Sequence, residues 1–242
     1  MIGIAFSGCA CRAAFHAGVA TALSEGGLAI GMAAGASSGS LVAAALAAGR
    51  GRELQDVWRS LAGRSVMSLR RLLWNRSIFD MSHIVRTTLN TYLGDGDLRS
   101  GPIEGLVTAT RLRDLSRVVF SSREEVDLIE PLLASCYLPV LYGRTVRVRG
   151  ELYVDGGVLD NLPIETLAER GADEVIAVVT SPEGHCLKDL RRRSWTPVLE
   201  GSKLHVIRPH KTLTLKSWDF DRDRMERAID EGYARGREFL GQ

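Results

Sequence analysis

The chain has 242 residues, of which 45% are hydrophobic and 25% are charged, proportions that are ordinary for a globular protein. Its formal net charge of +2 is too small to indicate nucleic acid as the main partner. No hydrophobic run approaches the roughly 18 residues of a membrane span, and no secretory signal is found at the N-terminus. We therefore expect a cytoplasmic protein, and secretion by a route that uses some other signal stays open.

The first part of the chain alternates strands and helices. The hydrophobic run Ile2–Phe6 predicts a buried strand, which is followed by a loop. A helix is expected over Arg12–Leu23, a second strand over Leu28–Ala33 and a second helix over Leu41–Ala48. This order predicts a parallel sheet covered by helices.

Residues 50–95 have few strand signals and are predicted to form a helical insert. Within it, Val66–Trp74 combines hydrophobic and basic residues with a tryptophan, which is the composition of a segment that lies at a membrane surface. The same composition fits an insert that packs on its own domain. Under the first interpretation, residues 66–74 make peripheral membrane contact.

Strand signals return in the second half of the chain. Strands are expected over Gly105–Thr110, Arg117–Ser122, Glu174–Val179 and Lys203–Ile207, and a hairpin over Val146–Val154. Helices are expected from about Glu124 to the stretch Ala134–Pro139, from Leu162 or Pro163 to Arg170 with Asn161 as N-cap, and over Asp221–Leu240. We therefore predict one α/β domain over residues 1–242, with three α/β/α layers, a mainly parallel central sheet and the helical insert.

The four cysteines indicate free thiols. Only Cys9 and Cys11 are close in sequence, and neither Cys136 nor Cys186 completes a second close pair. This spacing argues against a zinc site and against a disulfide framework. We expect reduced thiols in a reducing compartment, with no metal ion and no cofactor.

A candidate nucleophile lies between the second strand and the second helix. Gly35, Ser37 and Gly39 have the G-x-S-x-G spacing of a nucleophile elbow, in which a serine occupies a sharp turn from a strand into a helix. The pattern predicts an exposed Ser37 hydroxyl at a helix N-terminus. Such a hydroxyl is the nucleophile of an acyl-transfer enzyme.

A serine needs a base to take its proton. None of the five histidines has a distinctive setting, although a triad that uses His185, His205 or His210 stays open. The better candidate is Asp155, which ends a predicted strand and is followed by Gly156 and Gly157. Taken alone, these residues also fit a simple hairpin turn.

Together these segments resemble the patatin-like phospholipases, which have a glycine-rich loop after the first strand, a G-x-S-x-G elbow and a D-G-G or D-G-A turn, in that order. Further matches are Arg12, the run His16–Val19, the stretch Ala134–Pro139 and Asp155–Pro163. The resemblance extends from Ile4 to about Phe239.

The resemblance implies a lipid acyl hydrolase of the phospholipase A or esterase type that uses a serine–aspartate dyad. Ser37 would attack the ester carbonyl and form an acyl-enzyme, and Asp155 would accept the proton and later activate water. The loop with Gly8, Cys9, Ala10 and Arg12 would supply the oxyanion hole. This chemistry needs no calcium.

The loop departs from the family pattern G-G-G-x-R-G, because Cys9, Ala10 and Ala13 stand where glycines are usual. A side chain keeps the backbone N–H but excludes dihedral angles that only glycine tolerates. Either these positions need no positive φ, or the oxyanion hole is distorted and activity is low. The alternative function is therefore a weak or inactive relative that binds acyl lipid or membrane.

Overall fold

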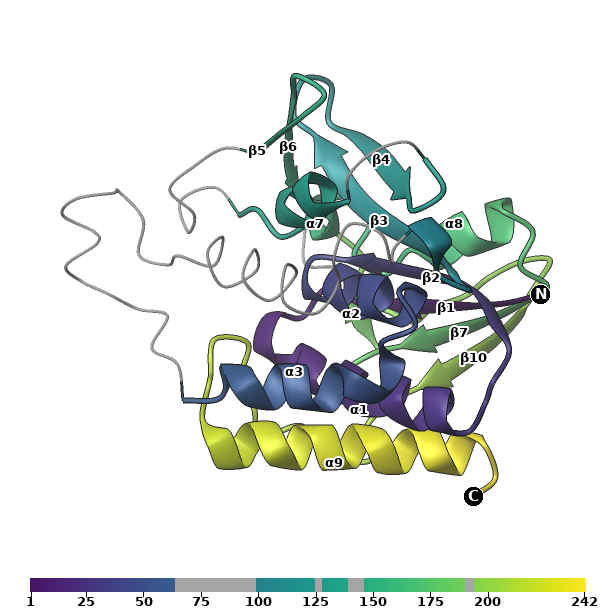
Figure 1. Cartoon of the computed structure of the whole chain (residues 1–242), viewed down its shortest axis with the longest axis vertical. Helices are drawn as coiled ribbons and strands as arrows, with labels where there is room; N and C mark the ends of the chain where they lie inside the picture. The colour runs from purple at the N-terminus through teal and green to yellow at the C-terminus, as the bar shows by residue number, and fades with distance from the viewer. Residues whose placement is uncertain (64–98, 125–127, 139–145, 190–193) are drawn as a thin grey trace, which may run out of the picture.

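The computed structural model describes most of the chain, and Figure 1 shows its architecture. The described residues are 1–63, 99–124, 128–138, 146–189 and 194–242. The insert expected over residues 50–95 is described only as far as residue 63. Its remaining part, including the segment 66–74 expected at a membrane, lies outside the described residues.

The described strands form one mixed, mostly parallel sheet of eight strands and a short hairpin. The sheet has the order β10-β7-β1-β2-β3-β6-β5, with β4 paired to β3. Strands β10, β7, β1, β2 and β3 are parallel, and β4 and β6 pair with β3 in the antiparallel sense. The bounds are β1 Ile2–Phe6, β2 Ile30–Ala36, β3 Glu104–Arg111, β4 Ser116–Ser121, β5 Val146–Val148, β6 Glu151–Asp155, β7 Glu174–Val178 and β10 Lys203–Ile207, with the hairpin strands β8 Cys186–Leu187 and β9 Ser194–Trp195.

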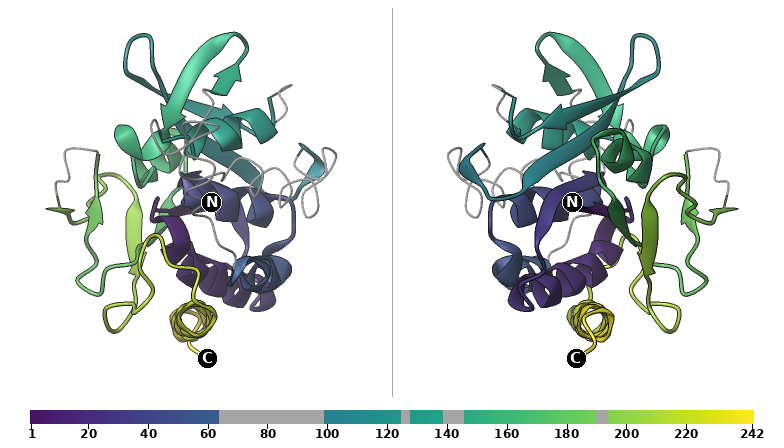
Figure 2. Two further views of the ribbon diagram at one scale, coloured as in Figure 1. Left: turned by 90° about the vertical axis from the view of Figure 1, so that its left-hand side faces the viewer. Right: turned by 90° about the vertical axis from the view of Figure 1, so that its right-hand side faces the viewer.

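Helices cover both faces of the sheet (Figure 2). The α-helices are α1 Ala13–Glu25, α2 Ser38–Ala47, α3 Leu54–Leu61, α7 Ile129–Ser135, α8 Ile164–Glu169 and α9 Arg222–Phe239. Three-residue 3-10 helices occupy Ala10–Arg12, Gly51–Glu53 and Gly156–Val158. The architecture is thus the single α/β domain with a mainly parallel sheet that the sequence predicts.

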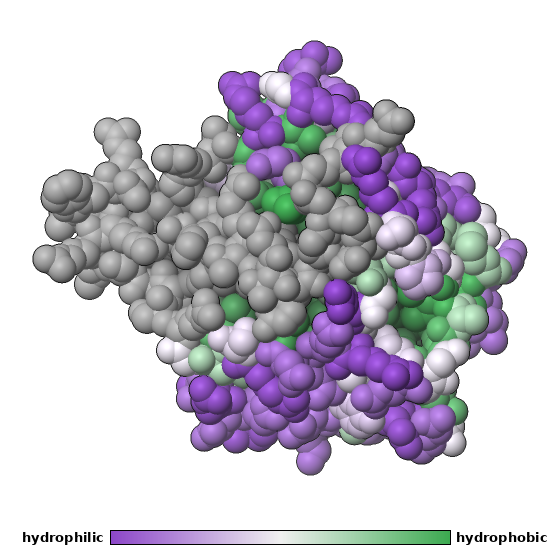
Figure 3. Space-filling model, in the orientation of Figure 1, coloured by the Kyte–Doolittle hydropathy of each residue, from purple (hydrophilic) through white to green (hydrophobic). Residues whose placement is uncertain are grey.

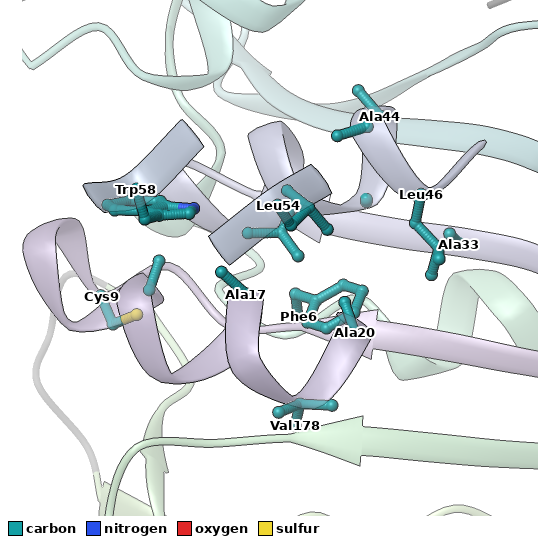
Figure 4. Close-up of a cluster of buried hydrophobic side chains, with 14 of the residues drawn as sticks. Phe6, Cys9, Ala17, Ala20, Ala33, Ala44, Leu46, Leu54, Trp58 and Val178 are labelled. Atoms are coloured by element: carbon teal, nitrogen blue, oxygen red, sulfur yellow. The ribbon is translucent and has the colours of Figure 1, made fainter. Parts of the chain in front are cut away.

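The alternation of side chains along β1 divides the core into two layers, because successive side chains of a strand point to opposite faces. Ile4 and Phe6 belong to the hydrophobic cluster between the sheet and the layer of α1, α2, α3 and α9. Figure 4 shows Phe6 beside Ala17 of α1 and Leu54 of α3. Ala5 belongs to the second cluster, which includes Leu167 of α8.

The C-terminal helix α9 packs along α1 (Figures 1 and 2). Glycines permit the close approach: a Cβ atom on Gly18 would lie 2.1 Å from the carbonyl oxygen of Ile229, and one on Gly232 would lie 2.0 Å from that of Phe15. The buried positions of α9 form one stripe, and its outer surface is hydrophilic (Figure 3). None of the helices that the structure describes is long and apolar enough to cross a membrane.

Most predicted elements are confirmed, and the differences gather around the loops. Strand β2 ends at Ala36 rather than Ala33, and α2 begins at Ser38 rather than Leu41. Small residues give a weak local signal here, whereas pairing of β2 with β1 and β3 extends the strand to its end. The turn into the helix is therefore tighter than predicted.

Two predicted helix starts are wrong. Glu124 lies in a turn closed by its N–H bond to Ser121, and α7 begins at Ile129. The prediction of Asn161 as N-cap also fails, because α8 begins at Ile164 with Pro163 at its N-cap position. The Asn161 side chain instead donates to the carbonyl oxygen of Gly8 at 3.2 Å.

Candidate active site

Ser37 occupies a sharp turn between β2 and α2. Its backbone has φ 52° and ψ −132°, a conformation that residues other than glycine rarely adopt. A Cβ atom on Gly35 would lie 2.4 Å from the carbonyl group of Gly39, and one on Gly39 would lie 2.3 Å from the carbonyl oxygen of Phe6. The two glycines therefore let the strand, the helix and the end of β1 meet at one point. In parallel sheets, the carboxyl ends of the strands are where ligands bind.

Hydrogen bonds hold the strained Ser37 backbone on both sides. Its N–H donates to the hydroxyl of Ser135 at 2.9 Å. Its carbonyl oxygen accepts from the Ser40 N–H at 2.9 Å and from the Ser40 hydroxyl at 2.6 Å. Backbone conformations of this kind persist only when the surroundings impose them.

Asp155 ends β6 and lies within reach of this turn. The Ser37 side chain hydrogen-bonds the Asp155 carboxyl group, and the Gly157 N–H donates to Asp155 Oδ1 at 2.7 Å. Asp155 is only 4% exposed, and its burial raises its pKa to about 7, although the two hydrogen bonds oppose this effect. A carboxylate with a pKa near neutrality is a far better base than one near 4.

The residues after Asp155 form a short 3-10 helix rather than a simple hairpin turn. A Cβ atom on Gly156 would lie 2.1 Å from the carbonyl oxygen of Thr108, and one on Gly157 would lie 2.6 Å from Asn161 Oδ1. These glycines therefore let the chain fold tightly against β3 and against Asn161.

Several backbone N–H groups of the loop after β1 donate hydrogen bonds to other parts of the protein. The Gly8 N–H donates to the Asn161 carbonyl oxygen at 3.0 Å, the Cys9 N–H to the Ser38 hydroxyl at 3.2 Å and the Cys11 N–H to the Ser217 carbonyl oxygen at 3.0 Å. Among the residues that the structure describes, no acceptor is found for the Ala10 N–H.

Ala10 is also the position where the loop has a positive φ, of 52°. The other two replaced glycines have ordinary backbone angles, with φ −155° at Cys9 and φ −64° at Ala13. An L-residue in the left-handed region costs roughly 1–2 kcal/mol relative to the right-handed region. Strain from the altered loop is therefore confined to one residue.

The charged and ionisable groups of this loop are largely buried. Burial raises the pKa of Cys9 to about 11, opposed by the nearby Arg12 charge. Burial and the same charge lower the pKa of His16 to about 3. The thiol and the imidazole, 3.8 Å apart at Nδ1, are thus both neutral at pH 7, and the Cys9 thiol is not activated as a nucleophile. Arg12 Nε is buried and has no hydrogen-bond partner among the described residues.

Two of the three histidines considered for a triad lie beside glutamates. His205 Nε2 lies 2.7 Å from Glu174, and the ring packs edge-on against Phe239. His210 lies near the carboxylates of Glu231 and Glu238 on α9. The groups that hydrogen-bond the Asp155 carboxyl group are Ser37 and Gly157, neither of them a histidine. In the described part of the chain, no group of three or more His, Cys, Asp or Glu residues is placed to hold a metal ion.

Two residues that contact this site were not predicted as part of it. Ser135 bonds the Ser37 backbone, and Asn161 joins the first loop to the turn after Asp155. Both lie inside segments on which the family resemblance is based. Only the folded structure shows which atoms they contact, because their partners are remote in sequence.

Comparisons with known proteins agree with this architecture. Residues 4–168 match the family model described as patatin-like phospholipase. Patatin-like phospholipase domain-containing protein 4 of Homo sapiens is 30% identical over 173 residues, which cover 67% of each chain. The 1-acylglycerol-3-phosphate O-acyltransferase Pnpla3 of Mus musculus is 30% identical over 176 residues, covering 66% of this chain and 40% of that protein.

More distant relatives extend the comparison. Lysophospholipase NTE1 of Debaryomyces hansenii is 26% identical over 189 residues, covering 73% of this chain but 12% of that protein. This chain thus spans less than half of the mouse and yeast relatives. The crystal structure of VipD from Legionella pneumophila aligns over 99% of this chain and 66% of the VipD chain, with a TM-score of 0.58 and 13% identity. This similarity concerns the fold alone. The chain belongs to the patatin-like phospholipase family.

Proposed function

We propose that this protein hydrolyses carboxylic esters of lipids, with Ser37 as nucleophile and Asp155 as general base. The observation that carries the proposal is the hydrogen bond between Ser37 and the buried Asp155 carboxyl group, whose pKa burial raises to about 7. A base with this pKa is about half ionised near neutral pH and can take the serine proton there.

The reaction proceeds in two halves. Ser37 Oγ attacks the ester carbonyl while its proton passes to Asp155, and the resulting tetrahedral intermediate expels the alcohol, which takes the proton back from Asp155. A water molecule then gives a proton to Asp155 and attacks the acyl-enzyme. Collapse of the second intermediate returns the proton to Ser37 and releases the carboxylic acid.

Backbone amides would stabilise the oxyanion of each intermediate. The Ala10 N–H is the candidate donor from the first loop. The Ser38 N–H is the second candidate, because the first amides of a helix have no acceptor within the helix and because the residue after the nucleophile commonly serves this purpose. Gly8 and Cys9, predicted as further parts of the hole, donate their amides within the protein.

The names of the relatives support a proposal for the substrate class. The yeast protein is named a lysophospholipase and the mouse protein an acylglycerophosphate acyltransferase. Both names concern an acyl group on a glycerophospholipid skeleton, and we propose an acyl glycerolipid as substrate here. Such molecules reside in membranes or micelles, so the enzyme needs peripheral contact with a lipid surface.

The test is hydrolysis by the purified chain of a soluble ester, p-nitrophenyl butyrate, and of lysophosphatidylcholine. We expect Ser37→Ala and Asp155→Asn each to reduce turnover to background, and a fluorophosphonate probe to label the wild type but not Ser37→Ala. Full activity in Asp155→Asn would exclude the dyad, and loss of activity on replacing His185, His205 or His210 would favour a triad.

A weakly active or inactive lipid-binding protein is the second candidate. Ala10 favours it, because this residue holds a positive φ at a position where the family usually has glycine. An Ala10→Gly variant distinguishes the two: a large gain in turnover would show that the natural loop limits catalysis. A wild type that binds lysophospholipid but resists the probe would establish binding without turnover.

A further inference from the structure

We propose that the C-terminal end of α7 aligns the Ser37–Asp155 pair and that Ser135 is the positioning residue through which it does so. This inference rests on the proposed function, because it concerns the same two residues. It assigns a role to a hydroxyl group that touches neither substrate nor reacting atoms.

Ser135 connects three parts of the fold through one fully buried hydroxyl group. Its Oγ accepts the Ser37 N–H at 2.9 Å and donates to the Thr108 carbonyl oxygen of β3 at 2.7 Å. A serine hydroxyl has a single hydrogen. Donation to Thr108 therefore fixes the orientation of the hydroxyl and directs a lone pair towards the Ser37 amide.

The contact matters because Ser37 is strained. Its carbonyl oxygen accepts hydrogen bonds from Ser40, which lies in the first turn of α2, the helix that Ser37 precedes directly. The bond from the Ser37 N–H to Ser135 ties the Ser37 backbone to a separate element of the fold. Without it, the half-buried amide loses its acceptor and the strained φ angle can relax, which would carry the Ser37 side chain away from Asp155.

The same short segment also holds Asp155. The carbonyl oxygen of Tyr137, which follows Ser135 closely in the chain, accepts the Asp155 N–H at 2.8 Å. Ser37 follows Ala36 of β2, which pairs with Thr108 of β3, and Asp155 of β6 pairs with the next residue of β3, Ala109. Because β4 pairs with residues 106–111 of β3, β2 and β6 lie end to end along the other edge of β3. The end of α7 therefore bonds the chain at the point where β2 and β6 meet and sets the position of one residue relative to the other.

A matched control separates positioning from general stability. Ser122 is buried at 1% exposure, and its hydroxyl accepts the Gly105 N–H at 2.9 Å. This bond has the same chemistry and length as the bond from Ser37 to Ser135 and is more deeply buried, but it lies towards the opposite end of β3 from Asp155. Ser122→Ala thus removes an equivalent bond away from the dyad.

The experiment measures kcat and KM for p-nitrophenyl butyrate, the pH dependence of kcat/KM and the melting temperature of both variants. For Ser135→Ala we expect kcat to fall by about 10-fold to 100-fold with KM within about twofold of the wild type, as for a misplaced nucleophile. The acidic limb of the pH profile should move to higher pH, because the Ser37 hydrogen bond is one of the contacts that lower the pKa of Asp155. Ser122→Ala should keep kcat and the pH profile.

Two results would overturn the inference. One is a folded Ser135→Ala enzyme with wild-type kcat and an unmoved pH profile, and the other is an equal loss of kcat in Ser122→Ala, which would trace the effect to stability. If Ser135→Ala does not fold, Ser135→Cys serves instead, because its sulfur is a weaker hydrogen-bond acceptor than the serine oxygen. We expect the kcat of Ser135→Cys to lie between that of the wild type and that of an enzyme without this hydrogen bond. A Cys variant with undiminished kcat would also refute the role.

Crystal structures of the wild type and the two alanine variants give a readout that needs no turnover. We expect the Ser37 hydroxyl to leave Asp155 in Ser135→Ala and to keep its place in Ser122→Ala. A wild type that neither hydrolyses esters nor reacts with the fluorophosphonate would refute the proposed function alone. An unmoved Ser37 in the Ser135→Ala crystal would refute the positioning role whatever the activity.

Discussion

Replacement of Asp155 by asparagine should stabilise the protein at neutral and alkaline pH while it abolishes catalysis. Burial raises the pKa of Asp155 from 3.8 to about 7, so the folded protein holds a proton that the unfolded chain releases between these pH values. Stability therefore decreases as the pH rises through this range. Asparagine keeps an oxygen for the Gly157 N–H but is never charged.

The size of the effect follows from the two pKa values. The difference between 3.8 and about 7, at about 1.36 kcal/mol for each pKa unit, corresponds to about 4 kcal/mol of unfolding free energy. We expect the difference between Asp155→Asn and wild type to be near zero below about pH 4. It should grow between about pH 4 and 7 and stay level above about pH 7.

Urea denaturation followed by the fluorescence of the four tryptophans, at intervals from pH 4 to 8, measures this difference. Asp114→Asn is a control of opposite sign, because hydrogen bonds from Arg111 and Ser116 lower the pKa of Asp114. Because the pKa of Asp114 lies below its unfolded value of 3.8, that variant should be less stable than wild type by an amount that stays level from about pH 4 to 8. A difference for Asp155→Asn that does not change with pH would refute the assignment of a buried, proton-holding carboxyl group.

Other predictions concern the rest of the site. On a soluble ester, kcat/KM of the wild type should rise about tenfold per pH unit until about pH 7 and then level off, because Asp155 must lose its proton to act as base; a limb near pH 4 would contradict this. Ala10→Gly should raise the unfolding free energy by about 1 kcal/mol in denaturant titrations because it relieves a positive φ, whereas Ala13→Gly, at φ −64°, should lower it. Gly39→Ala would place a Cβ atom 2.3 Å from a carbonyl oxygen, so probe labelling should disappear, and wild-type labelling would show that the turn tolerates it. Asn161→Ala removes the bond to the Gly8 carbonyl oxygen, and kcat should fall without loss of helicity by circular dichroism.

The sequence by itself determined the elements with strong local patterns. The hydrophobic runs of β1 and β7 and the amphipathic helix α9 appear in the structure nearly as predicted, because each buries a face that its own residues define. Ser37 and Asp155 could also be named from the sequence, because each is part of a short motif with a recognisable spacing.

The contacts of the candidate site were decided by tertiary structure alone. The sequence of the loop does not predict that the Cys9 amide donates to Ser38. It also does not predict the positive φ of Ala10. The hydroxyl of Ser135 reaches Ser37 only because α7 packs over β3. Hydrogen bonds between residues far apart in the chain depend on how the elements pack, and no local pattern encodes that packing.

The candidate base likewise depends on the sequence for its identity and on the tertiary structure for its pKa. The sequence determines that a carboxylate follows a strand and precedes two glycines. Its proton affinity, however, comes from the exclusion of water by the residues that surround it in the fold. Burial is a property of the whole packed structure, so the sequence could name Asp155 as the candidate base but only the tertiary structure could raise its pKa.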